Sequence, residues 1–250
     1  MEQAQNKFVA DPAVRVAAPA LRRRGPGSTA QGRRARDRVL QASIDLITEA
    51  GIDQVRLATI AQRADMSTGQ VMYYFTSKEH ILLEALAWRE HEDTRRRRAS
   101  LRKIDDAWRQ LGRFVDRYLP TSPVDPSWIL WIEAWARAPH NAEVSSFLDE
   151  LMVPWREDLA QIVERGAQQG TFEPPDAIDD FTIRFCALLD GLAIFHLRHM
   201  PNLPRQRVAQ LAMDAARAEL TAAARAELTA ATRAPSPSPA AHIPGGGIVS

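Results

Sequence analysis

Hydrophobic residues recur at helical spacing along most of this chain, and polar or proline-rich segments separate one helical stretch from the next. The first clear stretch covers residues 33–50 and is followed by Gly51, a residue typical of helix ends. Its apolar stripe, at i, i+3, i+7, i+8 and i+11, consists of Val39, Ala42, Leu46, Ile47 and Ala50. This spacing predicts an amphipathic helix that packs along one side.

Two shorter helical patterns follow, on either side of Asp65-Met66-Ser67. Asp tolerates the left-handed backbone that ends a helix, and Ser67 is a good N-cap for the next one. On the second of these helices Val71 and Phe75 form an apolar i, i+4 pair. Two helices joined by so short a turn predict a helix-turn-helix, whose second helix can enter the major groove of DNA.

A further helix is predicted to begin after Thr76, because Thr76 to Glu79 has the form of a capping box with Thr76 as the cap. This helix continues to four consecutive arginines, Arg95 to Arg98. Cations are favourable at the carboxy terminus of a helix, so we interpret these arginines as a solvated helix end rather than a DNA contact.

Beyond Leu101 the chain has helical periodicity throughout, and we expect no strand anywhere in the sequence. The predicted helices cover residues 104–119, 127–138, 141–169, 176–199 and 205–231, with a kink at Pro154. The last of them contains the repeat ARAELTAA at 216–223 and again at 224–231. We interpret the repeat as a tandem duplication that lengthens a partly exposed helix.

These elements predict an all-α protein with two units. An N-terminal three-helix helix-turn-helix domain is expected at residues 33–78, and a connecting helix at 79–100 joins it to a C-terminal helical domain at 101–233. Residues 1–32, a basic arm, and residues 234–250 are rich in Pro, Gly, Ala and Ser, and we expect both to be disordered.

The formal net charge of +1 hides an asymmetry between the two halves of the chain. Residues 22–103 hold 17 Lys and Arg against 10 Asp and Glu, whereas residues 104–250 hold 13 against 19. Such an asymmetry favours a nucleic-acid-binding face in the N-terminal half, with ordinary solvated surface as the alternative.

The run Ser67 to Glu79, STGQVMYYFTSKE, lies close behind an amphipathic helix that ends in Ala50-Gly51. It resembles the recognition-helix signature of TetR-family transcriptional regulators, and the resemblance extends over residues 33–88. Two positions depart from the family pattern, since Asp65 stands where the family usually has Gly and Met72 where it usually has a phosphate-binding Tyr. The resemblance implies a homodimeric regulator, usually a repressor, that leaves a pseudo-palindromic DNA operator when a small-molecule effector binds.

The candidate DNA-binding residues combine base-contacting and phosphate-contacting side chains. Gln bonds bidentately to adenine, Thr contacts a thymine methyl group, and Tyr, Lys and Arg reach phosphates. The candidates are Arg33, Arg34, Arg56, Thr59, Ser67, Thr68, Gly69, Gln70, Met72, Tyr73, Tyr74 and Lys78.

In this family the C-terminal helices enclose a ligand pocket, and the last two pair with their counterparts in a dimer. The run ALLDGLAIFHLRH at 187–199 is also similar to the choline-responsive branch of the family. Three tryptophans at 128, 131 and 135 share one helical face, which fits either an apolar core or a pocket wall. A pocket wall favours an apolar or cationic effector, since Trp faces attract cations.

The ligand-binding and dimerisation candidates follow from that assignment. The ligand-binding candidates are Trp128, Trp131, Glu133, Trp135, Phe147, Trp155, Phe185 and Asp190, in which the two carboxylates would balance a positive ligand. The dimerisation candidates are Phe181, Leu188, Gly191, Leu192 and Phe195, on a helix apolar around most of its circumference.

Other classes of protein lack support in the sequence. We find no nucleophile–base pair, glycine-rich phosphate loop or metalloprotease motif, so we expect no catalytic residue, no cofactor and no enzyme. His196 and His199 have no second pair of ligands, so we expect no metal site. Cys186 is interpreted as a buried packing residue, and a single cysteine, which excludes an intrachain disulfide, fits a reducing cytoplasm. No apolar run approaches the length of a membrane span, so we expect no membrane partner. The alternatives are a small-molecule-binding protein with an inactive helix-turn-helix and a transcriptional activator of the same fold.

Overall fold

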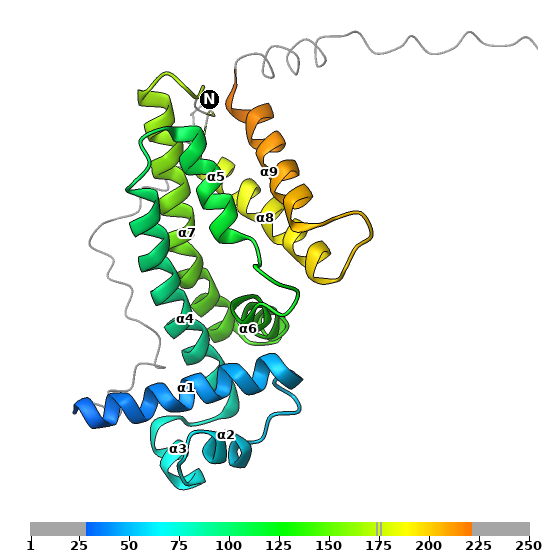
Figure 1. Ribbon diagram of the computed structural model, residues 1–250. Helices are drawn as coiled ribbons and strands as arrows, with labels where there is room; N and C mark the ends of the chain where they lie inside the picture. The colour runs from blue at the N-terminus through cyan, green and yellow to red at the C-terminus, as the bar shows by residue number, and fades with distance from the viewer. Residues whose placement is uncertain (1–28, 174, 176, 222–250) are drawn as a thin grey trace, which may run out of the picture.

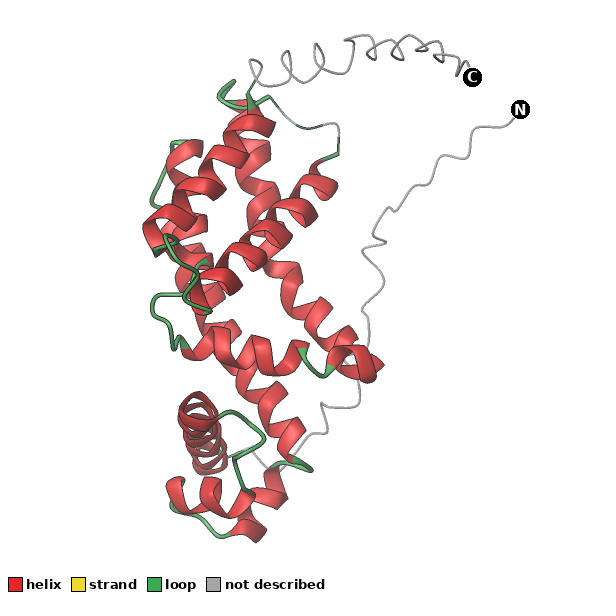
Figure 2. Cartoon of the chain, turned by 90° about the vertical axis from the view of Figure 1, so that its right-hand side faces the viewer, coloured by secondary structure: helices red, strands yellow, loops and turns green. Residues whose placement is uncertain are grey.

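The computed structural model describes residues 29–173, 175 and 177–221 (Figure 1). Within these residues the chain forms nine α-helices, one short 3-10 helix and no strand, which confirms the prediction of an all-α fold (Figure 2). The predictions for residues 1–28, for the tail at 234–250 and for the second copy of the repeat lie outside the described residues. None of the helices in the described ranges is both long and apolar enough to span a membrane.

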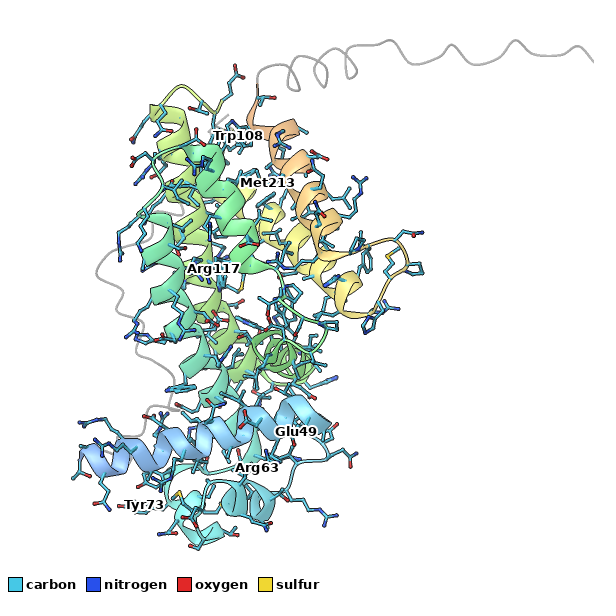
Figure 3. All side chains as sticks on the ribbon, in the orientation of Figure 1. Glu49, Arg63, Tyr73, Trp108, Arg117 and Met213 are labelled. Atoms are coloured by element: carbon cyan, nitrogen blue, oxygen red, sulfur yellow. The ribbon has the colours of Figure 1, made fainter. Side chains whose placement is uncertain are left out.

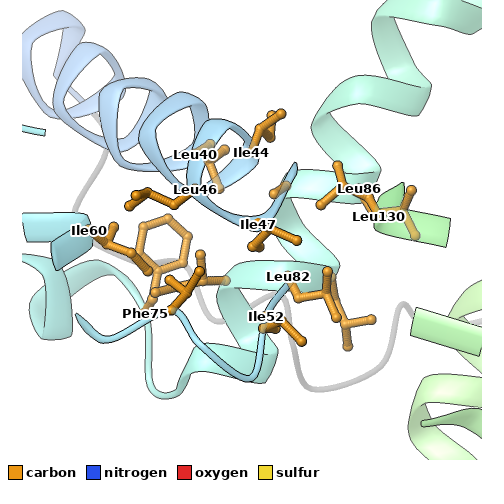
Figure 4. Packing of buried hydrophobic residues seen from close by; sticks show 14 of the residues in the cluster. Leu40, Ile44, Leu46, Ile47, Ile52, Ile60, Phe75, Leu82, Leu86 and Leu130 are labelled. Atoms are coloured by element: carbon orange, nitrogen blue, oxygen red, sulfur yellow. The ribbon is translucent and has the colours of Figure 1, made fainter. Parts of the chain in front are cut away.

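The N-terminal unit consists of α1 (Ala30–Ala50), α2 (Leu57–Arg63) and α3 (Thr68–Tyr74). Helix α1 begins three residues before the predicted start, because the Thr29 hydroxyl accepts a hydrogen bond from the Gly32 amide at 3.1 Å. Arg63 donates to both carboxylate oxygens of Glu49 at 3.1 Å, which ties α2 to the end of α1 (Figure 3). The interior of the unit is apolar (Figure 4), and its most buried side chains include Leu40, Ile47, Ile60, Val71 and Phe75.

Helix α4 (Lys78–Leu101) leads away from this unit, and its predicted N-cap is wrong by one residue. Ser77 is the cap, since its hydroxyl accepts from the His80 amide at 3.0 Å. A complete capping box lies instead at the start of α3, where Ser67 Oγ accepts from the Gln70 amide at 3.2 Å and Gln70 Oε1 accepts from the Ser67 amide at 2.8 Å. The Ser-x-x-Gln spacing of this box was already visible in the sequence.

The C-terminal unit contains α5 (Ala107–Tyr118), α6 (Pro126–Trp135), the 3-10 helix η1 (Ala138–His140), α7 (Ala142–Gln168), α8 (Ile178–Leu197) and α9 (Arg205–Leu220). The side chains of Asp106, Asp125 and Asn141 cap three of these helices, as short polar residues commonly do. Helix α7 continues through Pro154. In Figure 1, α8 and α9 lie on the side of this unit opposite α4, and α6 lies against α1.

The interpretation of Arg95 to Arg98 as a solvated helix end is wrong for Arg97, whose side chain is only 1% exposed. Arg97 Nε donates to Asp158 Oδ2 at 2.7 Å, and its guanidinium lies 3.5 Å from the centroid of the Trp155 ring. Arg98 Nε donates to the other oxygen of Asp158 at 2.6 Å, whereas Arg95 and Arg96 are exposed. The partner carboxylate lies 61 residues further along the chain, so local sequence carries no sign of it.

Candidate functional site

Helix α3 presents a polar surface at the end of the molecule remote from α9 (Figure 3). Val71 is its single buried residue. Tyr73 is 62% exposed and Met72 is 42% exposed, and Thr68, Gly69 and Gln70 are also exposed. Helix α3 is therefore anchored mainly by Val71, with Tyr74 partly packed against the same apolar cluster, and its other side chains remain accessible to a partner.

The other DNA-binding candidates also lie on the outside of the N-terminal unit. Exposed members of the set are Arg33, Arg34, Arg56, Thr59 and Ser67. Tyr74 is half-buried, with its ring edge-on to Tyr73 at 5.4 Å between centroids. Lys78 is half-buried, and its Nζ lies 3.5 Å from the carbonyl oxygen of Asp53. Gln70 Oε1 is engaged in the capping box, so Nε2 is the group that its side chain can offer most readily.

The C-terminal unit encloses a cavity of about 290 Å³. Side chains from α4 to α9 line it, so every long helix of the unit contributes to its wall. The lining residues are Arg89, Glu90, Asp93, Arg96, Arg97, Asp116, Arg117, Tyr118, Leu119, Thr121, Asp125, Ser127, Trp128, Trp131, Trp135, Met152, Trp155, Asp190 and Arg205.

The three tryptophans of α6 serve as core and cavity wall at once. Trp128 and Trp131 are 7% and 6% exposed, yet both line the cavity together with the half-buried Trp135. The Trp135 ring lies 5.3 Å from Trp131 and 6.0 Å from Trp128 between centroids. Trp155 of α7 also lines the cavity, although Arg97 already covers one face of its ring.

Five acidic side chains line the cavity and are matched in number by five arginines, and two of the acidic ones, Glu90 and Asp190, are hydrogen-bonded to aromatic side chains of its wall. Both oxygens of Glu90 accept indole hydrogen bonds, from Trp131 at 2.7 Å and from Trp155 at 2.9 Å, and burial raises the pKa of its carboxyl above the ordinary value. Asp190 accepts a hydrogen bond from the Tyr118 hydroxyl at 2.7 Å, and burial raises its pKa to about 6. Acidic groups beside aromatic faces give the part of the cavity around Glu90 and Asp190 the features of a cation site.

Comparison with known proteins assigns the family. Residues 39–85 match the family model for bacterial regulatory proteins of the tetR family, and residues 107–221 match that for the C-terminal part of BetI-type transcriptional repressors. A protein from Saccharomonospora viridis, described as a transcriptional regulator and solved with choline, is 30% identical, with a TM-score of 0.69, over 74% of this chain and 97% of that chain. This chain belongs to the TetR family.

Curated relatives in the TetR family match shorter segments. The transcriptional repressor KstR of Rhodococcus jostii is 42% identical over 77 residues, which cover 31% of this chain and 35% of KstR. The transcriptional regulator BetI of Burkholderia cenocepacia is 34% identical over 110 residues, which cover 42% of this chain and 56% of BetI. The chain therefore spans between about a third and somewhat more than half of these relatives. A TetR-family structure from a Rhodococcus species, 20% identical with a TM-score of 0.65, shares the fold.

Three of the predicted ligand-binding residues lie outside the cavity of this TetR-family protein. Phe147 packs against the apolar cluster of the N-terminal unit, and Phe185 is 2% exposed in the core of the C-terminal unit. Glu133 faces the N-terminal unit, where its Oε1 accepts from the Ile52 amide at 3.1 Å. Only residue type indicated these three positions in the sequence. Helical spacing does not show which neighbouring element each face of a helix contacts.

Glu90, Asp93, Arg97 and Tyr118 line the cavity but were not among the predicted residues. A signal for two of them was present, because Leu83, Leu86, Glu90 and Arg97 follow one another at i, i+3, i+7 and i+14 and are all buried. Two charged residues on the apolar face of a helix indicate a buried polar contact or a binding site.

The dimerisation candidates on α8 divide between two faces. Phe181 is fully buried and stacks on Phe185 with 5.4 Å between ring centroids, so its assignment to a dimer surface is wrong. Leu188 and Phe195 are 37% and 44% exposed, and Leu192 is half-buried. A Cβ atom added at Gly191 would have no atom of the described residues within 4 Å. Ile183, which is 52% exposed, was not predicted.

Cys186 is buried, as predicted, and burial raises the pKa of its thiol to about 12. A thiol with so high a pKa is almost entirely protonated at neutral pH and is a poor nucleophile. Among the residues that the structure describes, no group of three or more His, Cys, Asp or Glu is placed to hold a metal ion.

Proposed function

We propose that this TetR-family protein is a homodimeric transcriptional repressor that leaves its DNA operator when a small cationic effector enters the C-terminal cavity. The observation that carries the proposal is the surface of α3, which buries only Val71 and leaves polar and aromatic side chains accessible. A helix-turn-helix with such a second helix suits insertion into the major groove.

On DNA, Thr68 and Gln70 would contact base edges, whereas Tyr73, Tyr74 and Lys78 would contact phosphates. Outer phosphate contacts would come from Arg33, Arg34, Arg56 and Thr59, with Ser67, Gly69 and Met72 at the protein–DNA boundary. Gln70 would release or share its capping hydrogen bond when it bonds to adenine, because its Oε1 now accepts from the Ser67 amide.

The cavity supports a cationic effector of the quaternary ammonium class. Its aromatic wall of Trp128, Trp131 and Trp135 offers ring faces, and Asp190 offers a carboxyl group. The structure from Saccharomonospora viridis was solved with choline, which is such a cation. A cavity of about 290 Å³ is at the small end of ligand pockets and suits a molecule of that size.

A second copy of the chain is the proposed occupant of the exposed face of α8. Ile183, Leu188 and Phe195 are each more than a third exposed, although large apolar side chains in a helix are normally covered. The open space at Gly191 would let a partner helix approach closely. A dimer built on α8 would leave both α3 helices free for two half-sites.

Helix α6 supports the coupling of effector to DNA, because it contacts both the cavity and the N-terminal unit. Trp131 lines the cavity, while Glu133 accepts from the Ile52 amide. Arg137, just after the helix, bonds to Asp53 Oδ1 at 3.1 Å. An effector that shifts α6 would therefore move the loop between α1 and α2. Such a shift requires that the effector bind the DNA-releasing conformation more tightly than the DNA-binding one.

The test measures the affinity of the purified protein for duplex DNA from upstream of its own gene. The measurement uses fluorescence anisotropy, with and without choline. We expect binding as a dimer and release by choline. Gln70→Ala should cost roughly 1–3 kcal/mol and relax the preference at one base position, whereas Lys78→Ala should weaken all sequences alike and reduce the salt slope by about one. Gln161→Ala, at an exposed position on α7, is the matched control and should bind as the wild type does.

A monomer that is indifferent to duplex DNA would contradict the proposal. Equal losses on every sequence after Gln70→Ala would show instead that this side chain does not contact bases. Choline binding without any change in DNA affinity would separate a small-molecule-binding protein from a regulator.

A further inference from the structure

Glu90 of α4 is a carboxyl group built into the aromatic wall of the cavity. Its side chain is only 4% exposed, and it lines the cavity together with both of its hydrogen-bond donors. Trp131 Nε1 donates to Oε1 at 2.7 Å and Trp155 Nε1 donates to Oε2 at 2.9 Å. One carboxyl group thus connects three helices and fixes two of the rings that face the cavity.

The charge of Glu90 has no ion-pair partner among the described residues. Arg97, two turns further along α4, attracts the Glu90 carboxylate but forms its ion pair with Asp158 of α7, and Asp93 on the same helix adds a repulsive charge. Four further arginines line the cavity, Arg89, Arg96, Arg117 and Arg205, but none of them forms an ion pair with Glu90 among the described residues. Arg89 donates to Ser127 Oγ at 3.0 Å, Arg96 pairs with Glu92, and Arg205 pairs with Asp116. A buried carboxylate without a paired cation is costly, and burial accordingly raises the pKa of Glu90.

A cation inside the cavity would remove that cost. Two indole hydrogen bonds use about half of the accepting capacity of a carboxylate, so lone pairs remain to face a ligand. The attraction between opposite charges is strong where water is excluded. Ring faces alone discriminate less, since tryptophan walls also bind neutral apolar molecules.

We propose that Glu90 is the specificity-determining residue of the cavity, which selects a positively charged effector over a neutral molecule of the same shape. This inference rests on the proposed function, because it concerns the effector of that function. Asp190 contributes less to the preference for a cation, since it is less buried than Glu90 and its charge is closer to water.

The test compares two probes of one shape, choline and 3,3-dimethylbutan-1-ol, in which a neutral carbon atom replaces the ammonium nitrogen. Binding of each probe to the full-length protein is measured by calorimetry. The wild type should bind choline at least about tenfold more tightly than the alcohol. Glu90→Gln keeps the size and one hydrogen-bond acceptor but removes the charge, so it should weaken choline about tenfold or more and change the alcohol less than about threefold.

The matched control is Glu164→Gln on α7. Glu164 is exposed and does not line the cavity, so this variant should bind both probes as the wild type does. A purely structural role for Glu90 predicts that Glu90→Gln weakens the two probes by the same factor, and that result would overturn the inference.

Two further results would also overturn it. The first is equal binding of both probes by the wild type. This measurement uses no variant, so it tests the inference even if Glu90→Gln does not fold. The second is loss of the preference in Asp190→Asn but not in Glu90→Gln. If choline still releases DNA in either case, the proposed function stands and only the role of Glu90 fails. If the wild type binds neither probe, the cationic effector of the proposed function fails as well.

Discussion

The buried contact between Arg97 and Asp158 gives the sharpest stability prediction. Both side chains are almost fully buried, at 1% and 3% exposure, and Asp158 bonds to Arg97 at 2.7 Å and to Arg98 at 2.6 Å. Among the described residues, Arg97 Nη1 has no hydrogen-bond partner, and Nη2 has only a 3.4 Å contact with Thr94. Asp158→Ala would therefore leave a buried guanidinium without its counter-charge.

The loss of one partner from a buried ion pair costs about 3–5 kcal/mol. For a chain of this size that loss corresponds to a decrease in Tm of roughly 6–20 °C. Urea denaturation followed by tryptophan fluorescence measures it directly, because Trp155 lies against the Arg97 guanidinium. The loss of Asp158 should also lower effector affinity, since Trp155 forms part of the cavity wall.

Glu157→Ala is the matched control for this measurement. Glu157 is an exposed carboxylate whose Oε2 lies 3.0 Å from Arg98 Nη2, and an ion pair of this kind contributes less than about 1 kcal/mol. Replacement of the pair by Arg97→Met with Asp158→Leu should recover most of the lost stability, because two apolar side chains leave no buried charge. If Asp158→Ala costs no more than Glu157→Ala, the account of the buried ion pair is refuted.

Three other predictions follow from single positions. Asp65 has a left-handed backbone with φ of 55°, a conformation that Gly adopts without strain. Asp65→Gly should therefore raise the free energy of unfolding by up to about 1 kcal/mol in thermal denaturation. A decrease would show instead that the Asp side chain stabilises the turn. A Cβ atom added at Gly166 would clash with the Phe172 ring, so Gly166→Ala should cost about 1–3 kcal/mol in urea denaturation. Gly112→Ala is the control and should cost less, because no atom of the described residues lies within 4 Å of a Cβ added there. The pKa of Asp190 is raised to about 6, so its carboxyl loses charge as the pH falls through that value. Choline affinity measured by calorimetry should therefore fall by up to about tenfold from about pH 7 to about pH 5. Because burial also raises the pKa of Glu90, the decrease is compared with that of Asp190→Asn: it should be smaller in this variant, and a decrease equal to that of the wild type would exclude a role for the Asp190 charge.

The sequence by itself determined the helices and the turn between α2 and α3. Apolar spacing and capping residues are local, so Ser67 placed the start of α3, and helical periodicity placed the starts of α5 and α6 within a few residues. The same locality explains the one-residue error at α4, where Thr76 and Ser77 both fit a cap and only the folded backbone selects Ser77. The exposed surface of α3 also followed from the sequence, because Val71 is the apolar residue that anchors it.

Only the tertiary structure decided which neighbour each helical face meets. Helix α8 is apolar around most of its circumference, so the sequence could not show that Phe181 faces the core and Phe195 faces outward. Glu133, predicted to line the cavity, contacts the N-terminal unit, whereas Glu90, which was not predicted, lies in the aromatic wall of the cavity. Both are glutamates on helices, so residue type and helical spacing do not distinguish them. The physical reason is that helical periodicity fixes which side chains share a face, whereas the burial and pairing of a charge depend on residues that are dozens of positions away in the chain.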